Sequence, residues 1–236
     1  MAGRPTWILD ELAHAGRENV DPQHVARYDA KMDADAAAEL RSLRDFGLAD
    51  GVTIVDLGTG TGQFALAAAA AADRVVAVDV SPVMLDRLDA KLAARDVGNV
   101  ERVRAGFLTY EHQGAPADLV YTRFALHHLP DFWKSLALKR MAAMLRPGGL
   151  LRLSDVVYDF APEEAETVLE NWISSLAGTD VEQGWTREEL EEHIRDEHST
   201  FTWLLEPMIR RAGFAIEARE ISDDRMLARY VCVKQG

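Results

Sequence analysis

The chain has 236 residues, of which 48% are hydrophobic, and a formal net charge of −13. This length and apolar content predict one domain with its own core, and the negative charge, with no basic run longer than Lys139-Arg140, argues against a nucleic-acid partner. No apolar stretch approaches the length of a membrane span, the charged N-terminus does not resemble a signal peptide, and the single Cys232 fits a reducing compartment, so we expect a cytoplasmic protein.

Two helices are expected in the first fifty residues. Asp21-Pro22 combines an N-cap residue with proline at the first helical position, which predicts a helix from there to about Lys31. A second helix should run from Ala34 to Phe46 and end at Gly47.

A strand, a glycine turn and a helix are predicted next. The apolar run Val52–Leu57 is followed by glycines at alternate positions, Gly58, Gly60 and Gly62, and then by an alanine-rich helix expected over Gln63–Ala72. Glycine is needed where the backbone takes positive φ or approaches a ligand closely, and the following helix N-terminus offers unpaired N–H groups. The turn is therefore a candidate ligand-binding loop.

A second strand, Arg74–Asp79, ends in a carboxylate about 20 residues after Gly58. Nucleotide-binding βαβ units place at this spacing the acid that accepts hydrogen bonds from ribose hydroxyls. Strand, glycines, helix, strand and acid in this order predict a nucleotide-binding unit far more strongly than the glycines alone.

The alternation of strands and helices then continues, and it predicts a mostly parallel sheet covered on both faces. Further strands are expected at Val100–Ala105, Leu119–Arg123 and Leu150–Ser154, and helices at Pro82–Arg95 and Phe132–Leu145. After Asp155 the pattern predicts three helices, with a kink or restart at Pro207 in the last, and then two strands joined by a short turn. Their ranges are Pro162–Leu176, Thr186–Asp196, Ser199–Ala212, Phe214–Ile221 and Met226–Lys234.

The D-x-G-x-G-x-G pattern that starts at Asp56 resembles the class I S-adenosylmethionine-dependent methyltransferases rather than the G-x-G-x-x-G of dinucleotide enzymes. Four later segments are similar to that family as well: Asp79–Leu85, Asp118–Tyr121, Ala125–Leu129 and Leu145–Leu150. The resemblance implies a Rossmann-like α/β fold with a seven-stranded, mostly parallel sheet and an antiparallel C-terminal strand. We interpret residues 1–236 as a single domain with an N-terminal helical cap (1–50), a cofactor-binding core (51–155), a helical lid between strands five and six (156–212) and a closing hairpin (213–236).

The resemblance also implies roles for residues in the core. The glycine turn would meet the methionine part of the cofactor, Asp56 would lie near its amino group or order the turn, and Asp79 would hold the ribose. Met84 would pack on the adenine ring, and the alternative is ordinary packing of its helix. The family often has an acid at the position of Phe107, and this chain does not. The expected cofactor-binding residues are Tyr28, Asp56, Gly58, Gly60, Gly62, Asp79, Val80, Met84, Gly106, Phe107 and Arg123.

His127 and His128 follow the fourth predicted strand, at the sheet edge where ligands bind in open α/β folds. Histidine accepts a proton readily near neutral pH, so both are candidate catalytic bases, and the alternative is that they order the loop. No metal is expected, because adjacent histidines are poorly placed to share one ion and His193 and His198 are not spaced by four.

These features predict S-adenosylmethionine-dependent methyl transfer, by direct in-line displacement, to oxygen or nitrogen of a small-molecule acceptor. The five tryptophans all lie outside the core between Gly51 and Arg123, so they are expected to wall the acceptor pocket or to attach the lid to the body. The alternatives are a nicotinamide-dependent oxidoreductase and a non-catalytic protein that binds S-adenosylmethionine. We expect a monomer or a homodimer, with neither nucleic acid nor a membrane as partner.

Overall fold

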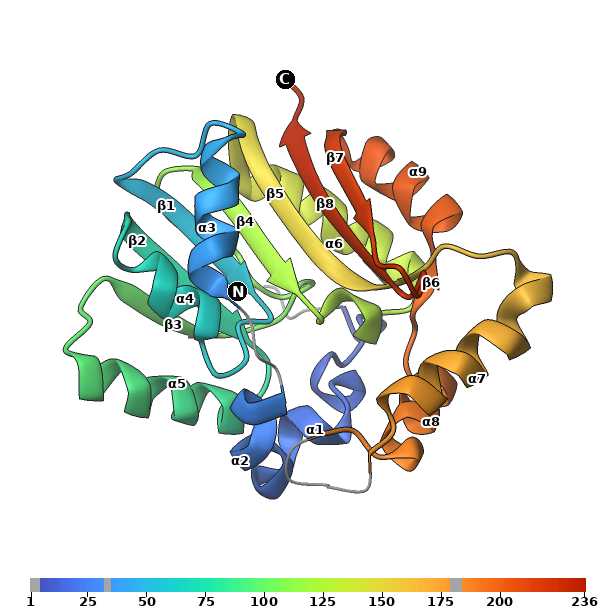
Figure 1. The fold of residues 1–236 in the computed structure, drawn as a ribbon. Helices are drawn as coiled ribbons and strands as arrows, with labels where there is room; N and C mark the ends of the chain where they lie inside the picture. Colours follow the sequence, from blue (N-terminus) through green and yellow to red (C-terminus); the bar gives the residue numbers. More distant parts are fainter. Residues whose placement is uncertain (1–4, 32–34, 179–183) are drawn as a thin grey trace.

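The computed structural model describes residues 5–31, 35–178 and 184–236. In these ranges one sheet has the strand order β3-β2-β1-β4-β5-β8-β7, and the short β6 pairs with β5 (Figure 1). All neighbouring strands are parallel except β8, which is antiparallel to both β5 and β7. The strands are β1 (Val52–Leu57), β2 (Ala72–Asp79), β3 (Val100–Arg104), β4 (Ala117–Arg123), β5 (Leu145–Tyr158), β6 (Thr200–Phe201), β7 (Phe214–Ile221) and β8 (Leu227–Lys234). The predicted fold class is confirmed.

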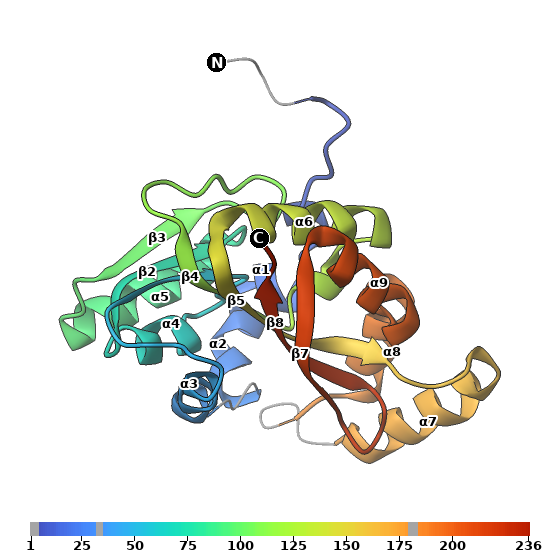
Figure 2. The same ribbon diagram turned by 90° about the horizontal axis from the view of Figure 1, so that it is seen from above.

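Helices cover both faces of the sheet (Figure 2). Alternate residues of β1 face opposite sides, as a strand buried on both faces requires. Val55 belongs to the core shared with α6 (Asp131–Met144) and α9 (Thr202–Ala212), whereas Ile54 belongs to the core shared with α3, α4 and α5. The last three helices span Ala36–Arg44, Gln63–Ala68 and Pro82–Arg95.

The remaining helices lie beyond the carboxyl ends of the strands (Figure 1). They are the short turn η1 (Leu12–His14), α1 (Arg17–Val20) and α2 (Pro22–Lys31) from the N-terminal segment, η2 (Leu126–His128) after β4, and η3 (Pro162–Glu164), α7 (Ala165–Leu176) and α8 (Arg187–Asp196) from the predicted lid. Arg17 on α1 pairs with Glu192 on α8 at 3.2 Å. The N-terminal segment and the lid therefore meet over the edge where a ligand would bind. Every helix in the described ranges is too short or too polar to cross a membrane.

Several predicted boundaries are wrong for physical reasons. The helix after the glycine turn ends at Ala68 rather than Ala72, because Ala72 already pairs with Val52 in the sheet, which overrides the helix propensity of alanine. The segment 145–158 forms one long strand instead of the short strand at 150–154, since it pairs with both β4 and β8.

The last predicted helix also differs at its start. Thr200 and Phe201 form β6, and α9 then continues without a restart through Pro207. The second N-terminal helix begins at Ala36 with Asp35 as its N-cap, whose side chain accepts from Ala38 N. The predicted start at residue 34 lies outside the described residues.

Candidate functional site

The glycine turn joins β1 to α4, and all three of its glycines have positive φ. Gly58 is the most constrained, because a Cβ there would lie 2.4 Å from the Cβ of Ala125 on the neighbouring loop. An L-residue at this position would therefore be strained both in the backbone and in its packing. Gly58 and Gly60 line the space above the sheet without a side chain of their own.

Asp79 connects the glycine turn after β1 to the loop after β2. Its Oδ2 accepts from Gly60 N at 2.8 Å, and its Oδ1 accepts from Ser81 N at 2.8 Å. Asp79 is 9% exposed, and burial raises the pKa of its carboxyl group. Asp79 lines a cavity of about 60 Å³ together with six other residues of the predicted set: Tyr28, Gly58, Gly60, Val80, Gly106 and Phe107.

Asp56 lies on the other side of the turn. Its Oδ2 accepts from Thr59 Oγ1 at 2.6 Å, and burial raises its pKa to about 7. With Tyr28 and Arg123 it lines a smaller cavity of about 40 Å³. Tyr28 and Gly58 line this cavity and the 60 Å³ cavity, so the two cavities adjoin, and all of the predicted set except Gly62 and Met84 lines one or both of them.

Val80 and Met84, two residues of the predicted set, differ in whether they line a cavity. Val80 lines the 60 Å³ cavity. Met84 is fully buried in α5 and is not among the lining residues of the three cavities described here. The predicted packing of Met84 on adenine thus has no support from its position.

Glu11 brings a carboxylate to the loop that contains Phe107, although no local motif indicates it. Its two oxygens lie 3.2 Å and 3.1 Å from Leu108 N, which donates to them, and a Cβ at Gly106 would collide with them. Burial raises the pKa of Glu11 to about 7. Position 107 itself carries no acid, but the Glu11 carboxylate from the N-terminal segment lies beside this loop. Glu11 is far from Phe107 in the sequence, so a local motif could not predict this contact.

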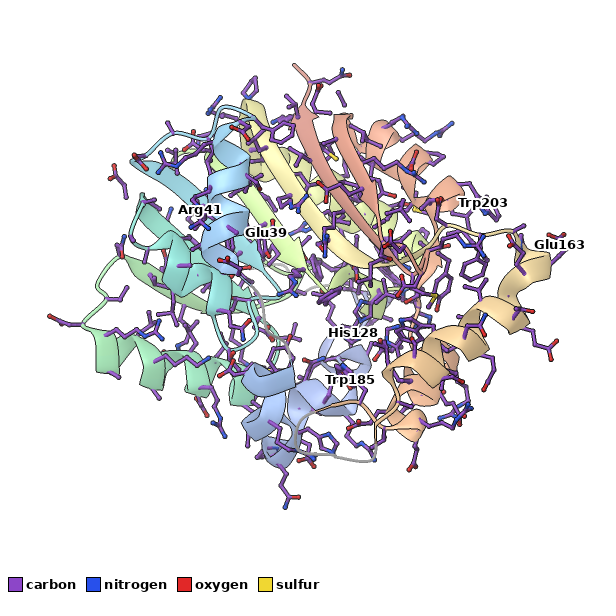
Figure 3. The ribbon with its side chains drawn as sticks, in the orientation of Figure 1. Glu39, Arg41, His128, Glu163, Trp185 and Trp203 are labelled. Carbon is purple, nitrogen blue, oxygen red and sulfur yellow. The ribbon has the colours of Figure 1, made fainter. Side chains whose placement is uncertain are left out.

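A larger cavity of about 260 Å³ lies between the N-terminal helices and the lid. Its lid side is lined by Trp172, Trp185 and Leu190. Of the five tryptophans, the other three lie elsewhere: Trp7 stacks on Trp133, and Trp203 on Phe201. Figure 3 shows Trp185 and His128 near each other between the strand ends and the N-terminal helices.

The larger cavity adjoins the one beside the glycine turn. Both are lined by Asn19, Tyr28, Phe124 and His128. Of the two candidate catalytic residues, His128 therefore borders both spaces, whereas His127 lines only the larger one.

The two histidines have opposite electrostatic environments. Burial alone would lower the pKa of His127, but Asp155 and Glu197 raise it: Nδ1 is hydrogen-bonded to Asp155, and Nε2 lies 3.0 Å from Glu197 Oε2. For His128, burial and the neighbouring His127 both lower the pKa. Neither Asp155 nor Glu197 was identified from the sequence, since each belongs to a different element from the histidine pair.

The family model for the methyltransferase domain matches residues 54–149, from β1 into the first part of β5. The uncharacterized methyltransferase YrrT of Bacillus subtilis is 27% identical over 173 residues, which are 73% of this chain and 74% of that protein. Residues 54–149 therefore match a methyltransferase domain. This result supports the predicted methyltransferase family, enzyme class and cofactor, and it favours them over the nicotinamide-dependent alternative.

Two further relatives of this methyltransferase match over shorter stretches. The 27-O-demethylrifamycin SV methyltransferase of Amycolatopsis mediterranei is 30% identical over 118 residues, 49% of this chain and 43% of that protein. The cypemycin N-terminal methyltransferase of a Streptomyces species is 39% identical over 102 residues, 42% of this chain and 40% of that protein. Less than half of each of these two proteins is matched, so their acceptors are not assigned by the match.

Solved structures share the fold of this methyltransferase. Magnesium protoporphyrin IX methyltransferase (ChlM) of Synechocystis with bound S-adenosylmethionine has a TM-score of 0.65 at 15% identity, over 98% of this chain and all of that one. The [4+2]-cyclase SpnF has a TM-score of 0.64 at 15% identity, over 92% and 96% of the two chains. A fold that also carries a cyclase does not by itself define the reaction, which must be argued from the site.

Proposed function

We propose that this methyltransferase transfers the methyl group of S-adenosylmethionine to an oxygen or nitrogen of a small-molecule acceptor bound in the 260 Å³ cavity. The observation that carries the proposal is the wall shared by the two spaces: Asn19, Tyr28, Phe124 and His128 line both the cavity at the glycine turn and the larger one. Direct transfer needs donor and acceptor to meet at one point, and adjoining cavities satisfy this requirement.

The residues at the sheet edge fit the cofactor. The positive-φ glycines keep side chains out of the space above the turn, and the buried Asp79 carboxylate retains lone pairs beyond those used by Gly60 and Ser81. We assign the ribose to Asp79 and the methionine end to the turn, with Asp56, Tyr28 and Arg123 beside it. The cofactor supplies an electrophilic methyl group, and the protein contributes alignment and exclusion of water.

The larger cavity fits an organic acceptor with apolar surface. Trp172, Trp185 and Leu190 give it aromatic and aliphatic walls, which are typical of small-molecule sites. His128 lies where the cavities meet, so it is the histidine in position to contact the acceptor, and His127 is held behind it by Asp155. The relatives that act on 27-O-demethylrifamycin SV and on the cypemycin N-terminus support transfer to either oxygen or nitrogen.

The test is a screen for formation of S-adenosylhomocysteine with panels of phenols, alcohols and amines, followed by two tryptophan variants. Trp185→Ala should raise the KM for the accepted compound at least 10-fold while leaving S-adenosylmethionine affinity unchanged. Trp203→Ala is the matched control, because Trp203 is 55% exposed on α9, away from the cavity (Figure 3). Loss of cofactor binding in Trp185→Ala, or an unchanged KM, would contradict the assignment of the acceptor to this cavity.

A further inference from the structure

Three side chains with metal-binding groups converge on the wall of the larger cavity. His127 and His128 come from η2, directly after β4, and Glu197 is the C-cap residue of α8. One ligand atom from each lies within 4.8 Å of one from each of the others. His127 is buried and the other two are half-buried, so the cluster is a partly enclosed site rather than an exposed acidic patch.

His127 is oriented from behind in the way that metal-ligating histidines usually are. Asp155 on β5 is hydrogen-bonded to the ring at Nδ1, and its other oxygen accepts from the His127 backbone N–H at 3.0 Å. This second contact fixes the loop as well as the ring. A carboxylate on one ring nitrogen sets the tautomer and leaves the other nitrogen, here Nε2, available to a metal.

The cluster also contains buried polar atoms that lack a hydrogen-bond partner within the residues that the structure describes. In the described part of the chain, four buried side-chain atoms have no hydrogen-bond partner, and two of them are His128 Nδ1 and Glu197 Oε2. Glu197 Oε2 lies 3.0 Å from His127 Nε2 and also contacts His193 Nδ1, so it already has two ion-pair partners, whereas His128 Nδ1 has no hydrogen-bond partner among the described residues. Burying a polar atom without a hydrogen-bond partner is unfavourable, so the unpartnered Nδ1 of His128 indicates a place for a ligand.

The two ring nitrogens of His128 differ in their surroundings, because Nε2 has polar neighbours and Nδ1 has no hydrogen-bond partner in the described ranges. Its Nε2 lies 4.0 Å from Glu18 Oε1 and 3.2 Å from Asn19 Nδ2. Asn19 Nδ2 already donates to the Ala15 carbonyl and to Glu18. Nδ1, which has no partner in the described part of the chain, is therefore the nitrogen that a ligand could reach without displacing an existing contact.

We propose that His127, His128 and Glu197 bind one divalent transition-metal ion, of the Zn²⁺, Fe²⁺ or Mn²⁺ type, on the wall of the 260 Å³ cavity. Two imidazoles and one carboxylate suit these borderline cations and leave coordination positions open. All three residues line the cavity, so the open positions face the space in which a ligand would enter.

This proposal replaces the expectation of no metal, which considered histidines only in pairs along the sequence. The chain folds so that the third ligand arrives from α8, and it is Glu197 rather than His198. The competing interpretation is a closed ion-pair network in which a protonated His127 lies between Asp155 and Glu197, and His193 Nδ1 also contacts Glu197. A metal would displace that proton.

The experiment is a titration of the full chain with Co²⁺ after removal of metals with a chelator. The visible absorption of Co²⁺ reports its coordination directly and does not depend on enzymatic activity. The proposal requires saturable binding of one Co²⁺ per chain, with displacement by Zn²⁺. Glu197→Gln and His128→Ala should each weaken binding at least 10-fold, and Asp155→Asn should weaken it about 10–100-fold.

His112→Ala is the matched control, because His112 contacts Tyr110 and Ala115 in the loop between β3 and β4 and does not line the 260 Å³ cavity. It should bind Co²⁺ like the wild type. The circular dichroism spectrum and S-adenosylmethionine affinity of each variant report whether it is folded. Absence of saturable Co²⁺ binding in the wild type, or equal affinity in the wild type and in folded Glu197→Gln or His128→Ala, would establish the ion-pair network and overturn the metal site.

Discussion

Asp79 accepts a hydrogen bond from the backbone N–H of Gly60, with 2.8 Å between Oδ2 and N. The residue assigned to the cofactor ribose therefore also holds the glycine turn in place. Because β1 and β2 are adjacent in the sheet, this single carboxylate couples the shape of the turn to the end of the neighbouring strand. Substitution at this position should affect cofactor binding both directly and through the turn.

Asp79→Ala should weaken S-adenosylmethionine binding by about 10-fold or more, since hydrogen bonds to a charged group contribute about 1.5–3 kcal/mol. The measurement is calorimetric titration with S-adenosylmethionine and S-adenosylhomocysteine. Asp73→Ala is the control, because Asp73 lies on the same strand but is exposed. Equal affinity in Asp79→Ala and the wild type would remove the ribose assignment.

Gly58→Ala should lose both stability and cofactor binding, and more stability than Gly47→Ala. Both glycines have positive φ, for which an L-residue costs about 1–2 kcal/mol. A Cβ at Gly47 meets nothing within 4 Å, whereas one at Gly58 would lie 2.4 Å from the Ala125 Cβ. Urea denaturation of the two variants separates the backbone cost from the packing cost. Equal destabilisation would show that the loop at Ala125 moves aside.

The predictable part of the site is the part whose residues are close in sequence. Gly58, Gly60 and Asp79 lie within one strand–helix–strand unit, where hydrophobic periodicity and glycine spacing specify both the turn and the acid. Glu11, Asp155 and Glu197 reach the site from three other elements, and nothing in their local sequence distinguishes them from solvated acids. Their contacts depend on how α8 and the N-terminal segment pack over the sheet.

The predicted ends of the helices and strands were wrong for a related reason. The alanine-rich run after Gln63 has high helix propensity, yet its last residue, Ala72, is recruited by pairing with β1. Likewise, the extent of β5 depends on β8, which follows much later in the chain. Local propensity predicted which elements form, and the sheet determined where they end.

Stability should depend on pH through Glu11. Burial raises the pKa of Glu11 from its ordinary value of 4.5 to about 7. Between these values the folded protein holds a proton that the unfolded chain has released, so the contribution of Glu11 to the free energy of unfolding falls as pH rises from about 4.5 to 7.

Glu11→Gln should remove that component and give a shallower decline over the same window. Urea denaturation across the window measures it, and Glu163→Gln is the control, because Glu163 is exposed at the start of the lid (Figure 3). A Glu11→Gln curve parallel to that of the wild type would mean that the buried carboxyl group titrates as it does in the unfolded chain.

Glu39 and Arg41 lie on opposite sides of α3 and should differ sharply in their contribution to stability (Figure 3). Glu39 accepts two hydrogen bonds from Arg152 on β5, at 2.8 Å from Nε and 2.9 Å from Nη2, and the Arg152 side chain is only 7% exposed. Arg41 pairs with Asp35 at 3.8 Å, and both side chains are more than 60% exposed.

Glu39→Ala leaves a buried guanidinium without its carboxylate, so we expect a loss of about 3 kcal/mol in the free energy of unfolding. Arg41→Ala should change it by less than about 0.5 kcal/mol, because exposed ion pairs are screened by solvent. Chemical denaturation measures both. The double variant Glu39→Leu/Arg152→Met should recover most of the loss, since replacing a buried pair with apolar side chains costs less than breaking it. No recovery would mean that the pair itself, rather than the isolated charge, stabilises the contact between α3 and the sheet.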